Sequence, residues 1–160
     1  MNNNHINQSG NIHMVDITEK EITLREAKAQ GFISINNKAL LSIIDLNNKK
    51  GDVLNTARIA GINAVKQTSI LIPLAHNILI NSVSVDFRID TEQSEIYSTV
   101  TVKSQGKTGV EIESLIGVEI SLMTIYDMCK YLDRSMIIND VKLISKTGGK
   151  SGDFIREKND

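Results

Sequence analysis

One long apolar stretch, residues 110–130, limits most strongly what this chain can fold into. It predicts a helix with almost no solvated face, because Glu119 is the only charged residue between Ser114 and Tyr126. A helix that is apolar on all sides is normally buried. A chain of 160 residues can build one domain around such a helix. One small domain has difficulty covering it completely, so the stretch also favours an oligomer.

The end of this helix carries the sequence TIYDMCK, in which Asp127 and Lys130 are three residues apart. Positions i and i+3 lie on the same face of a helix, so the two charges are predicted to point the same way. Burial and a charged neighbour both shift pKa values, which makes the pair a candidate for proton transfer. An ordinary ion pair at a helix end is the simpler interpretation, and the spacing by itself favours it.

Two glutamates, Glu111 and Glu113, precede the same helix and suggest an acid–base couple with Asp127. Continuous helix between Glu113 and Asp127 would separate them by about 21 Å, at about 1.5 Å per residue. The two carboxyl groups therefore cannot share a small pocket within one helix. Either the segment around Glu113 is a loop, or the two groups meet across a subunit interface.

The rest of the chain predicts an α+β fold. Alternating polar and apolar residues predict three strands, at 25–35, 80–89 and 96–103. A last strand is predicted at 137–145. Helices are predicted at 39–46 and 51–67, and Pro73 makes residues 71–77 a loop. The resulting order β-α-β-β-α-β is the ferredoxin-like, split β-α-β arrangement of an antiparallel sheet packed with helices.

A single domain is predicted at 15–154, between a disordered leader at 1–14 and a disordered tail at 155–160. The leader is rich in asparagine and shows no periodicity. One face of the helix at 51–67 carries small residues, which would let it pack closely against a sheet: Ala57, Ala60, Gly61 and Ala64.

Charge and cysteine content exclude several classes of function. A net charge of −1 without basic runs argues against a surface for nucleic acid or for an anionic membrane. The chain shows neither the ~18 apolar residues of a membrane span nor a secretory signal. The single cysteine, Cys129, excludes an internal disulfide and leaves no zinc-ligand spacing. We therefore expect a cytoplasmic protein without a transition-metal site.

Lys50 and His76 are two further candidates for chemistry. Lys50 stands at the start of a predicted helix, where a lysine is usually solvated. A lysine whose pKa is lowered by burial or by a second cation could instead exchange protons near neutrality. His76 follows an apolar loop segment and is either a buried, satisfied histidine or a donor that faces a ligand.

Two Gly-Lys segments, at 106–108 and 149–151, invite comparison with a phosphate loop. Both lack its earlier glycine, because Thr101 and Ile144 occupy that position. Loop glycines and lysines can still hold phosphates through backbone N–H groups and point charges. A flexible loop and a frayed terminus are equally good interpretations of these two segments.

Six segments, read together, are more specific than any single site. They are HMVD (13–16), KGDVLNTARIAGINAVKQT (50–68), LIPLAH (71–76), KTGVEIESL (107–115), TIYDMCK (124–130) and GGKSGDF (148–154). In this order, and over nearly the whole chain, they resemble the MoaC family of molybdenum-cofactor biosynthesis.

The resemblance implies a lyase that converts (8S)-3',8-cyclo-7,8-dihydroguanosine 5'-triphosphate to cyclic pyranopterin monophosphate and releases pyrophosphate. It also implies a ferredoxin-like fold assembled as a hexamer, a trimer of dimers, with the active site at a dimer interface. No resident cofactor is implied, and a requirement for Mg²⁺ with the triphosphate stays open.

The resemblance also implies roles for individual residues. The implied catalytic residues are Asp127, Lys50 and Lys130. The implied substrate-binding residues are Leu74, Ala75, His76, Ile112 and Glu113, with Arg25 and Lys146 holding the triphosphate. Ala75 and Asn77 depart from the usual cysteine and proline of the family.

A mechanism follows as a hypothesis. Lys50 and Lys130, placed near each other across an interface, are expected to depress each other's pKa, so that one serves as a base and the other as an acid. The alternative is a non-catalytic ferredoxin-like module that senses a small ligand at a subunit interface. That alternative gives no reason for Lys50, Asp127 and Lys130 to occur together.

Overall fold

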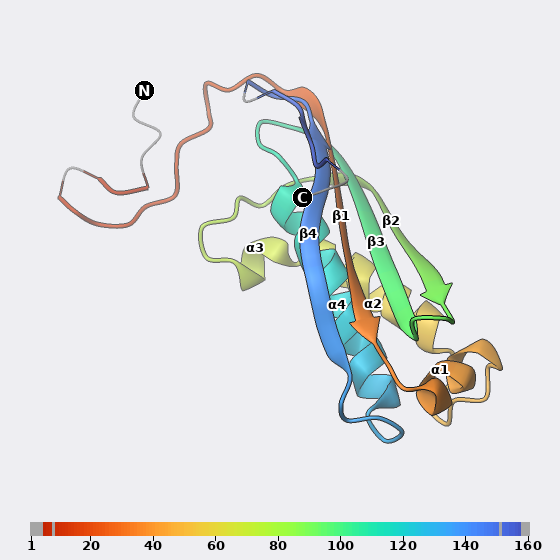
Figure 1. The fold of residues 1–160 in the computed structure, drawn as a ribbon. Helices are drawn as coiled ribbons and strands as arrows, with labels where there is room; N and C mark the ends of the chain where they lie inside the picture. The colour runs from red at the N-terminus through yellow and green to blue at the C-terminus, as the bar shows by residue number, and fades with distance from the viewer. Residues whose placement is uncertain (1–4, 8, 151, 158–160) are drawn as a thin grey trace.

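The computed structural model describes residues 5–7, 9–150 and 152–157 (Figure 1). Its elements, in chain order, are β1 (Thr23–Ser34), α1 (Asn37–Ile44), α2 (Val53–Lys66), α3 (Thr68–Leu71), β2 (Ile80–Asp90), β3 (Glu95–Gly106), α4 (Glu111–Cys129), β4 (Ile137–Thr147) and β5 (Phe154–Ile155). No helix among the described residues combines the length and the hydropathy that a membrane span requires.

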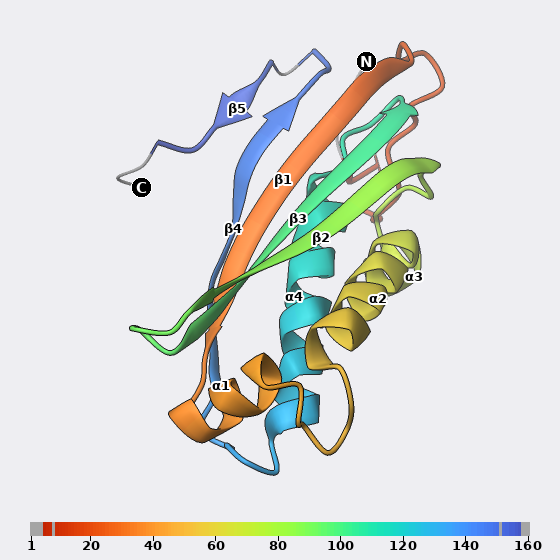
Figure 2. The same cartoon turned by 90° about the vertical axis from the view of Figure 1, so that its right-hand side faces the viewer.

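The strands form one sheet in the order β2-β3-β1-β4-β5, and each neighbouring pair in it is antiparallel. β1 and β2, which flank α1, α2 and α3 in the chain, are separated in the sheet by β3, as the split β-α-β arrangement requires. Helices α2 and α4 cover the same face of this sheet (Figure 2). The predicted ferredoxin-like α+β fold is confirmed.

Small residues in the central strand β1 let helix α4 approach the sheet closely. The predicted alternation holds, because Ala27, Ala29 and Ile33 are all buried on one face. Between them lies Gly31, where an added Cβ would stand 2.8 Å from Val141 Cγ2 and 3.1 Å from Val118 Cγ1. Both distances are shorter than ordinary contacts, so residues of α4 and β4 pack against Gly31 and leave no room for a side chain there.

Gly61 of helix α2 packs against α4 as well as against the sheet, the partner that the pattern of small residues predicted. A Cβ added at Gly61 would lie 3.0 Å from the carbonyl oxygen of Gly117 and 3.3 Å from Val85 of β2. The reason is that α2 and α4 lie side by side on the sheet (Figure 2), so Gly61 lies between the neighbouring helix and β2.

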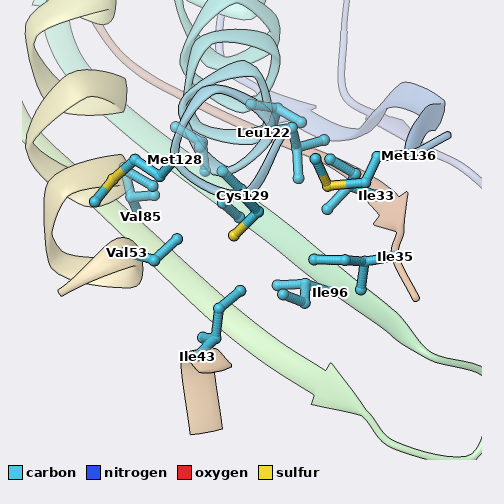
Figure 3. Packing of buried hydrophobic residues seen from close by; sticks show 14 of the residues in the cluster. Ile33, Ile35, Ile43, Val53, Val85, Ile96, Leu122, Met128, Cys129 and Met136 are labelled. Atoms are coloured by element: carbon cyan, nitrogen blue, oxygen red, sulfur yellow. The ribbon is translucent and has the colours of Figure 1, made fainter. Parts of the chain in front are cut away.

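The apolar core is continuous from the sheet to the end of α4. Figure 3 shows Leu122 and Cys129 of α4 near Ile33 of β1 and Ile96 of β3, and all four are fully buried. Burial raises the pKa of the Cys129 thiol to about 11. Cys129 therefore behaves as a small core residue rather than as a nucleophile.

Helix α4 is not completely covered within one chain, as expected from its apolar sequence in so small a domain. Its side away from the sheet and α2 carries an apolar stripe at helical spacing: Ile112, Ile116, Ile120 and Met123. Ile112 is 43% and Met123 is 53% exposed in the single chain. The stripe is about 16 Å long at 1.5 Å per residue, and Ile116 and Ile120 in its middle are only partly buried.

Several boundaries differ from the predicted ones. Helix α1 begins at residue 37 because the side chain of Asn36 accepts a hydrogen bond from the backbone N–H of Ala39 and caps the helix. The short helix α3 was not predicted. Residues 1–4 and 8 of the predicted leader and 158–160 of the predicted tail lie outside the described residues. Within the leader, Ile6 and Ile12 form an antiparallel bridge.

Candidate active site

Two lysines converge on one carboxylate at the C-terminal end of α4. Lys50 Nζ donates to Asp127 Oδ2 over 3.0 Å and to the Asp127 carbonyl oxygen over 2.8 Å. Lys130 Nζ lies 2.8 Å from Asp127 Oδ1. The predicted Asp127–Lys130 pair is present, but it is one half of a three-residue cluster. Lys50 and Lys130 meet on Asp127 within one chain, so their meeting needs no subunit interface.

A buried asparagine, which the sequence reasoning missed, holds Lys50 in place. Asn48 is 6% exposed, and its Oδ1 accepts a 2.9 Å hydrogen bond from the backbone N–H of Lys50. The Asn48 amide nitrogen lies 3.2 Å from Ser42 Oγ and 3.6 Å from Cys129 Sγ. The turn that carries Lys50 is thereby anchored to the end of α4. The turn-forming pair Asn47-Asn48 was the available signal.

The cluster keeps Asp127 ionised. Hydrogen bonds from Lys130 and then from Lys50 hold the pKa of the Asp127 carboxyl below its ordinary value. The side chains of Lys50, Asp127 and Lys130 are 37%, 56% and 52% exposed, so the ammonium groups are open to a ligand. Asp127 can therefore orient two proton-carrying groups toward the same approaching molecule.

A pocket of about 340 Å³ lies at the opposite, N-terminal end of α4. Its lining includes the five residues that the resemblance assigned to substrate binding outside the triphosphate: Leu74, Ala75, His76, Ile112 and Glu113. Glu113 is 3% exposed, and its burial raises its pKa to about 6. This ring pocket thus combines apolar walls with a carboxyl group that carries a proton more readily than an exposed one does.

The N-terminal segment also takes part in the ring pocket. His76 Nε2 lies 2.9 Å from the carbonyl oxygen of Val15, and Val15 and Ile17 line the pocket. A carbonyl oxygen only accepts, so Nε2 carries the proton, and in the neutral ring Nδ1 is left as an acceptor. Val15 belongs to the motif HMVD at 13–16, which the sequence singled out without predicting that it lines a pocket.

A second, basic pocket of about 590 Å³ adjoins the ring pocket, and Lys20, Thr108 and Gly109 line both. Its cationic side chains are Lys20, Arg25, Lys107, Lys146 and Lys150. Lys107 donates to the Thr18 carbonyl oxygen over 2.6 Å, and Lys146 lies 3.6 Å from Glu111. Arg25 and Lys146, which were expected to hold a triphosphate, thus line the same pocket. Lys20 and Lys107 line it too, and their place there was not predicted from the sequence.

Two buried polar atoms of this basic pocket have no hydrogen-bond partner among the described residues. They are Arg25 Nε and Thr23 Oγ1. Buried donors in proteins are normally paired, because an unpaired one loses its hydration without compensation. Both therefore have unused capacity toward a bound acceptor.

Comparison with known proteins assigns the family. The family model described as "MoaC family" matches residues 14–149, most of the chain. The chain belongs to the MoaC family. It is 50% identical over 153 residues to a cyclic pyranopterin monophosphate synthase of Helicobacter hepaticus. It is 47% identical over 153 residues to one of Peptoclostridium acidaminophilum, and both alignments cover 96% of each chain. A synthase of that name from Clostridium acetobutylicum is 48% identical over 152 residues, with coverage of 95% of this chain and 94% of the relative.

In this member of the MoaC family, α4 separates the lysine cluster from the two pockets. Glu113 lies in the first turn of α4 and Asp127 in its last, and the helix between them is continuous. The loop alternative for Glu113 is therefore wrong, and the two groups lie about 21 Å apart along the helix. Among the described residues, no group of three His, Cys, Asp or Glu side chains could hold a metal ion.

Proposed function

We propose that this protein is the lyase of molybdenum-cofactor biosynthesis that converts (8S)-3',8-cyclo-7,8-dihydroguanosine 5'-triphosphate to cyclic pyranopterin monophosphate and pyrophosphate. The observation that carries the proposal is the convergence of Lys50 and Lys130 on Asp127. This cluster occurs in a chain about half identical, over nearly its full length, to synthases of that name.

The lysine cluster supplies the proton transfers of the rearrangement. Opening of the purine ring and closure of the pterin ring both move protons, and ammonium groups held on one carboxylate can give and take them in turn. Asp127 orients both lysines. A lysine that lost its contact with Asp127 would no longer be held in one direction, because its side chain is long and flexible. One lysine gives its proton to the substrate as the acid, and the neutral amine that results takes a proton back from the substrate as the base.

The two adjoining pockets fit the two ends of the substrate. The guanine-derived ring occupies the ring pocket, where Glu113 and His76 Nδ1 offer hydrogen bonds. The triphosphate lies in the basic pocket, where the Arg25 fork and Lys146 neutralise it. The phosphate oxygens of the substrate are ligands that Mg²⁺ prefers, so a Mg²⁺ ion, if the reaction requires one, would be held by the triphosphate.

A second copy of the chain completes the site. Within one chain the ring pocket and the lysine cluster lie at opposite ends of α4, too far apart to touch one small substrate. Antiparallel pairing of two α4 helices through the apolar stripe would cover Ile112 and Met123 and bring the Asp127 end of one copy to the Glu113 end of the other. We propose such dimers, three of them in a hexamer, acting in the cytoplasm.

The proposed activity is tested with Lys50→Ala and Asp127→Ala. Incubation with the cyclised dihydro-GTP, followed by oxidation, converts the product into a fluorescent pterin. We expect each variant to lose about a hundredfold or more of turnover, the typical size of an acid–base contribution. The exposed lysine of β1 provides the matched control, Lys28→Ala, which should keep full activity. Near-normal product from Asp127→Ala would remove the assigned roles, and no product from the unmodified protein would remove the proposed activity.

The composite site is tested by mixing two inactive variants, Asp127→Ala and Glu113→Ala. In a mixed dimer, one site carries both changes and the other carries neither. Mixing by reversible dissociation should therefore restore about a quarter of the unmodified activity, as expected for random pairing around a two-fold axis. Restoration would fail if each chain contained a complete site, and sedimentation as a monomer at micromolar concentration would exclude the shared site altogether.

A further inference from the structure

The glycine pair Gly148-Gly149 follows β4 and turns the chain back toward β5. Both residues have left-handed backbones, with φ of +88° and +87°, a region that favours glycine. The backbone N–H of Gly148 donates to Asp153 Oδ1 over 3.1 Å, which closes the turn. Phe154 then pairs with Lys146 across the sheet. The pair therefore lies at the rim of the basic pocket, which Gly149 lines.

Gly149 lies directly against the guanidinium group of Arg25. A Cβ added at Gly149 would overlap Arg25 Nη1 and would stand 2.7 Å from Cζ and 3.2 Å from Nη2. The guanidinium thus fills the space that a side chain at this position would need. Its Nε is buried and has no hydrogen-bond partner among the described residues, so the group is packed in place without using all its donors.

We infer that Gly149 is a positioning residue, whose missing side chain lets the Arg25 guanidinium lie where it can donate to a polyphosphate in the basic pocket. The identity of the polyphosphate as a substrate group rests on the proposed function. The positioning itself rests on the contact between Gly149 and Arg25 and on the unpaired Nε. Arginine recognises phosphate through a planar fork, so a small rotation of the group loses aligned hydrogen bonds.

The two glycines of the pair differ in what surrounds them. A Cβ added at Gly148 would overlap the carbonyl oxygen of Leu24, so a substitution there would push backbone apart. At Gly149 the obstacle is the far end of a flexible side chain, which can move aside, so the remaining cost is the backbone strain of alanine at a φ of +87°. Gly149→Ala is therefore a specific perturbation of the direction of Arg25, whereas Gly148→Ala disturbs the turn itself.

Gly152 provides the matched control. Its φ is +73°, so alanine meets similar backbone strain, but a Cβ there would have nothing within 4 Å. Inorganic tripolyphosphate, titrated into the protein by calorimetry, is the probe. We expect Gly149→Ala to weaken binding by about tenfold to a hundredfold, the loss expected for hydrogen bonds to a charged group. Gly152→Ala should stay within about twofold of the unmodified protein.

A double-mutant cycle separates positioning from a general effect on the tail. In an Arg25→Ala background, Gly149→Ala should cost no more binding than Gly152→Ala does. In turnover, Gly149→Ala should raise KM for the cyclised nucleotide and leave kcat close to normal. Equal tripolyphosphate binding by Gly149→Ala and Gly152→Ala would overturn the inference, as would an undiminished Gly149→Ala effect without Arg25. Either result is independent of whether the unmodified protein forms the pterin product.

Discussion

Replacement of Glu113 by glutamine tests the electrostatics of the ring pocket most directly. Burial raises the pKa of Glu113 from 4.5 to about 6 in the folded protein. The folded protein therefore holds a proton that the unfolded chain releases between these two pH values. Stability from this group is present below about pH 4.5 and is lost as the pH rises through about 6. At about 1.4 kcal/mol per pH unit, the loss amounts to about 2 kcal/mol.

Glutamine cannot ionise, so Glu113→Gln should lack this pH dependence. Urea unfolding at about pH 4 and about pH 7.5, at one fixed protomer concentration, gives the free energy of unfolding for both proteins. The free energy of unfolding of Glu113→Gln, compared with that of the unmodified protein, should rise by about 2 kcal/mol from the lower to the higher pH. The exposed glutamate of the same helix supplies the control, Glu119→Gln, whose curve should follow the unmodified protein.

Parallel stability curves for Glu113→Gln and the unmodified protein would refute the reasoning, because they would mean that Glu113 ionises equally easily in both states. A carbon NMR titration of the Glu113 carboxyl provides an independent reading. Its midpoint should lie near pH 6. A midpoint at or below 4.5 would show that the carboxyl is not desolvated in the folded protein.

Two further predictions concern the framework of the site. Asp133 is 6% exposed and accepts hydrogen bonds from the backbone N–H groups of Asn36 and Ser135, at 2.7 Å and 2.8 Å. Asp133→Ala should therefore lower the free energy of unfolding by about 1–3 kcal/mol in urea titrations. The exposed Asp86 supplies the control, Asp86→Ala, and equal unfolding midpoints for these two variants would contradict the prediction. A Cβ added at Gly117 would stand 2.9 Å from Val65 and 3.0 Å from Val100. Gly117→Ala should cost about 1–3 kcal/mol by overpacking, and an unchanged melting temperature would show that α2 and β3 yield freely.

Local patterns in the sequence were sufficient for the elements and their order. Period-two alternation placed β1, β2 and β3 to within three residues at each end, because each of these strands has one face on the core. The apolar stretch placed α4, because one side of that helix is buried in the core. Pro73 marked the end of the helical region, since α3 ends at Leu71. The resemblance to the MoaC family added the residue roles, and the ring-pocket residues that it named do lie together.

Side-chain partners across long chain separations were decided only by the tertiary structure. Lys50 and Asp127 are 77 residues apart, and no periodicity in either segment reports the other. Asn48 and Gly149 were missed for the same reason: their roles depend on what the fold packs against them, Cys129 in one case and Arg25 in the other. The sequence of α4 determined that it would be a largely buried helix. Which of its sides the sheet and α2 would cover, and which would remain as an apolar stripe, depended on how two helices share one face of a sheet.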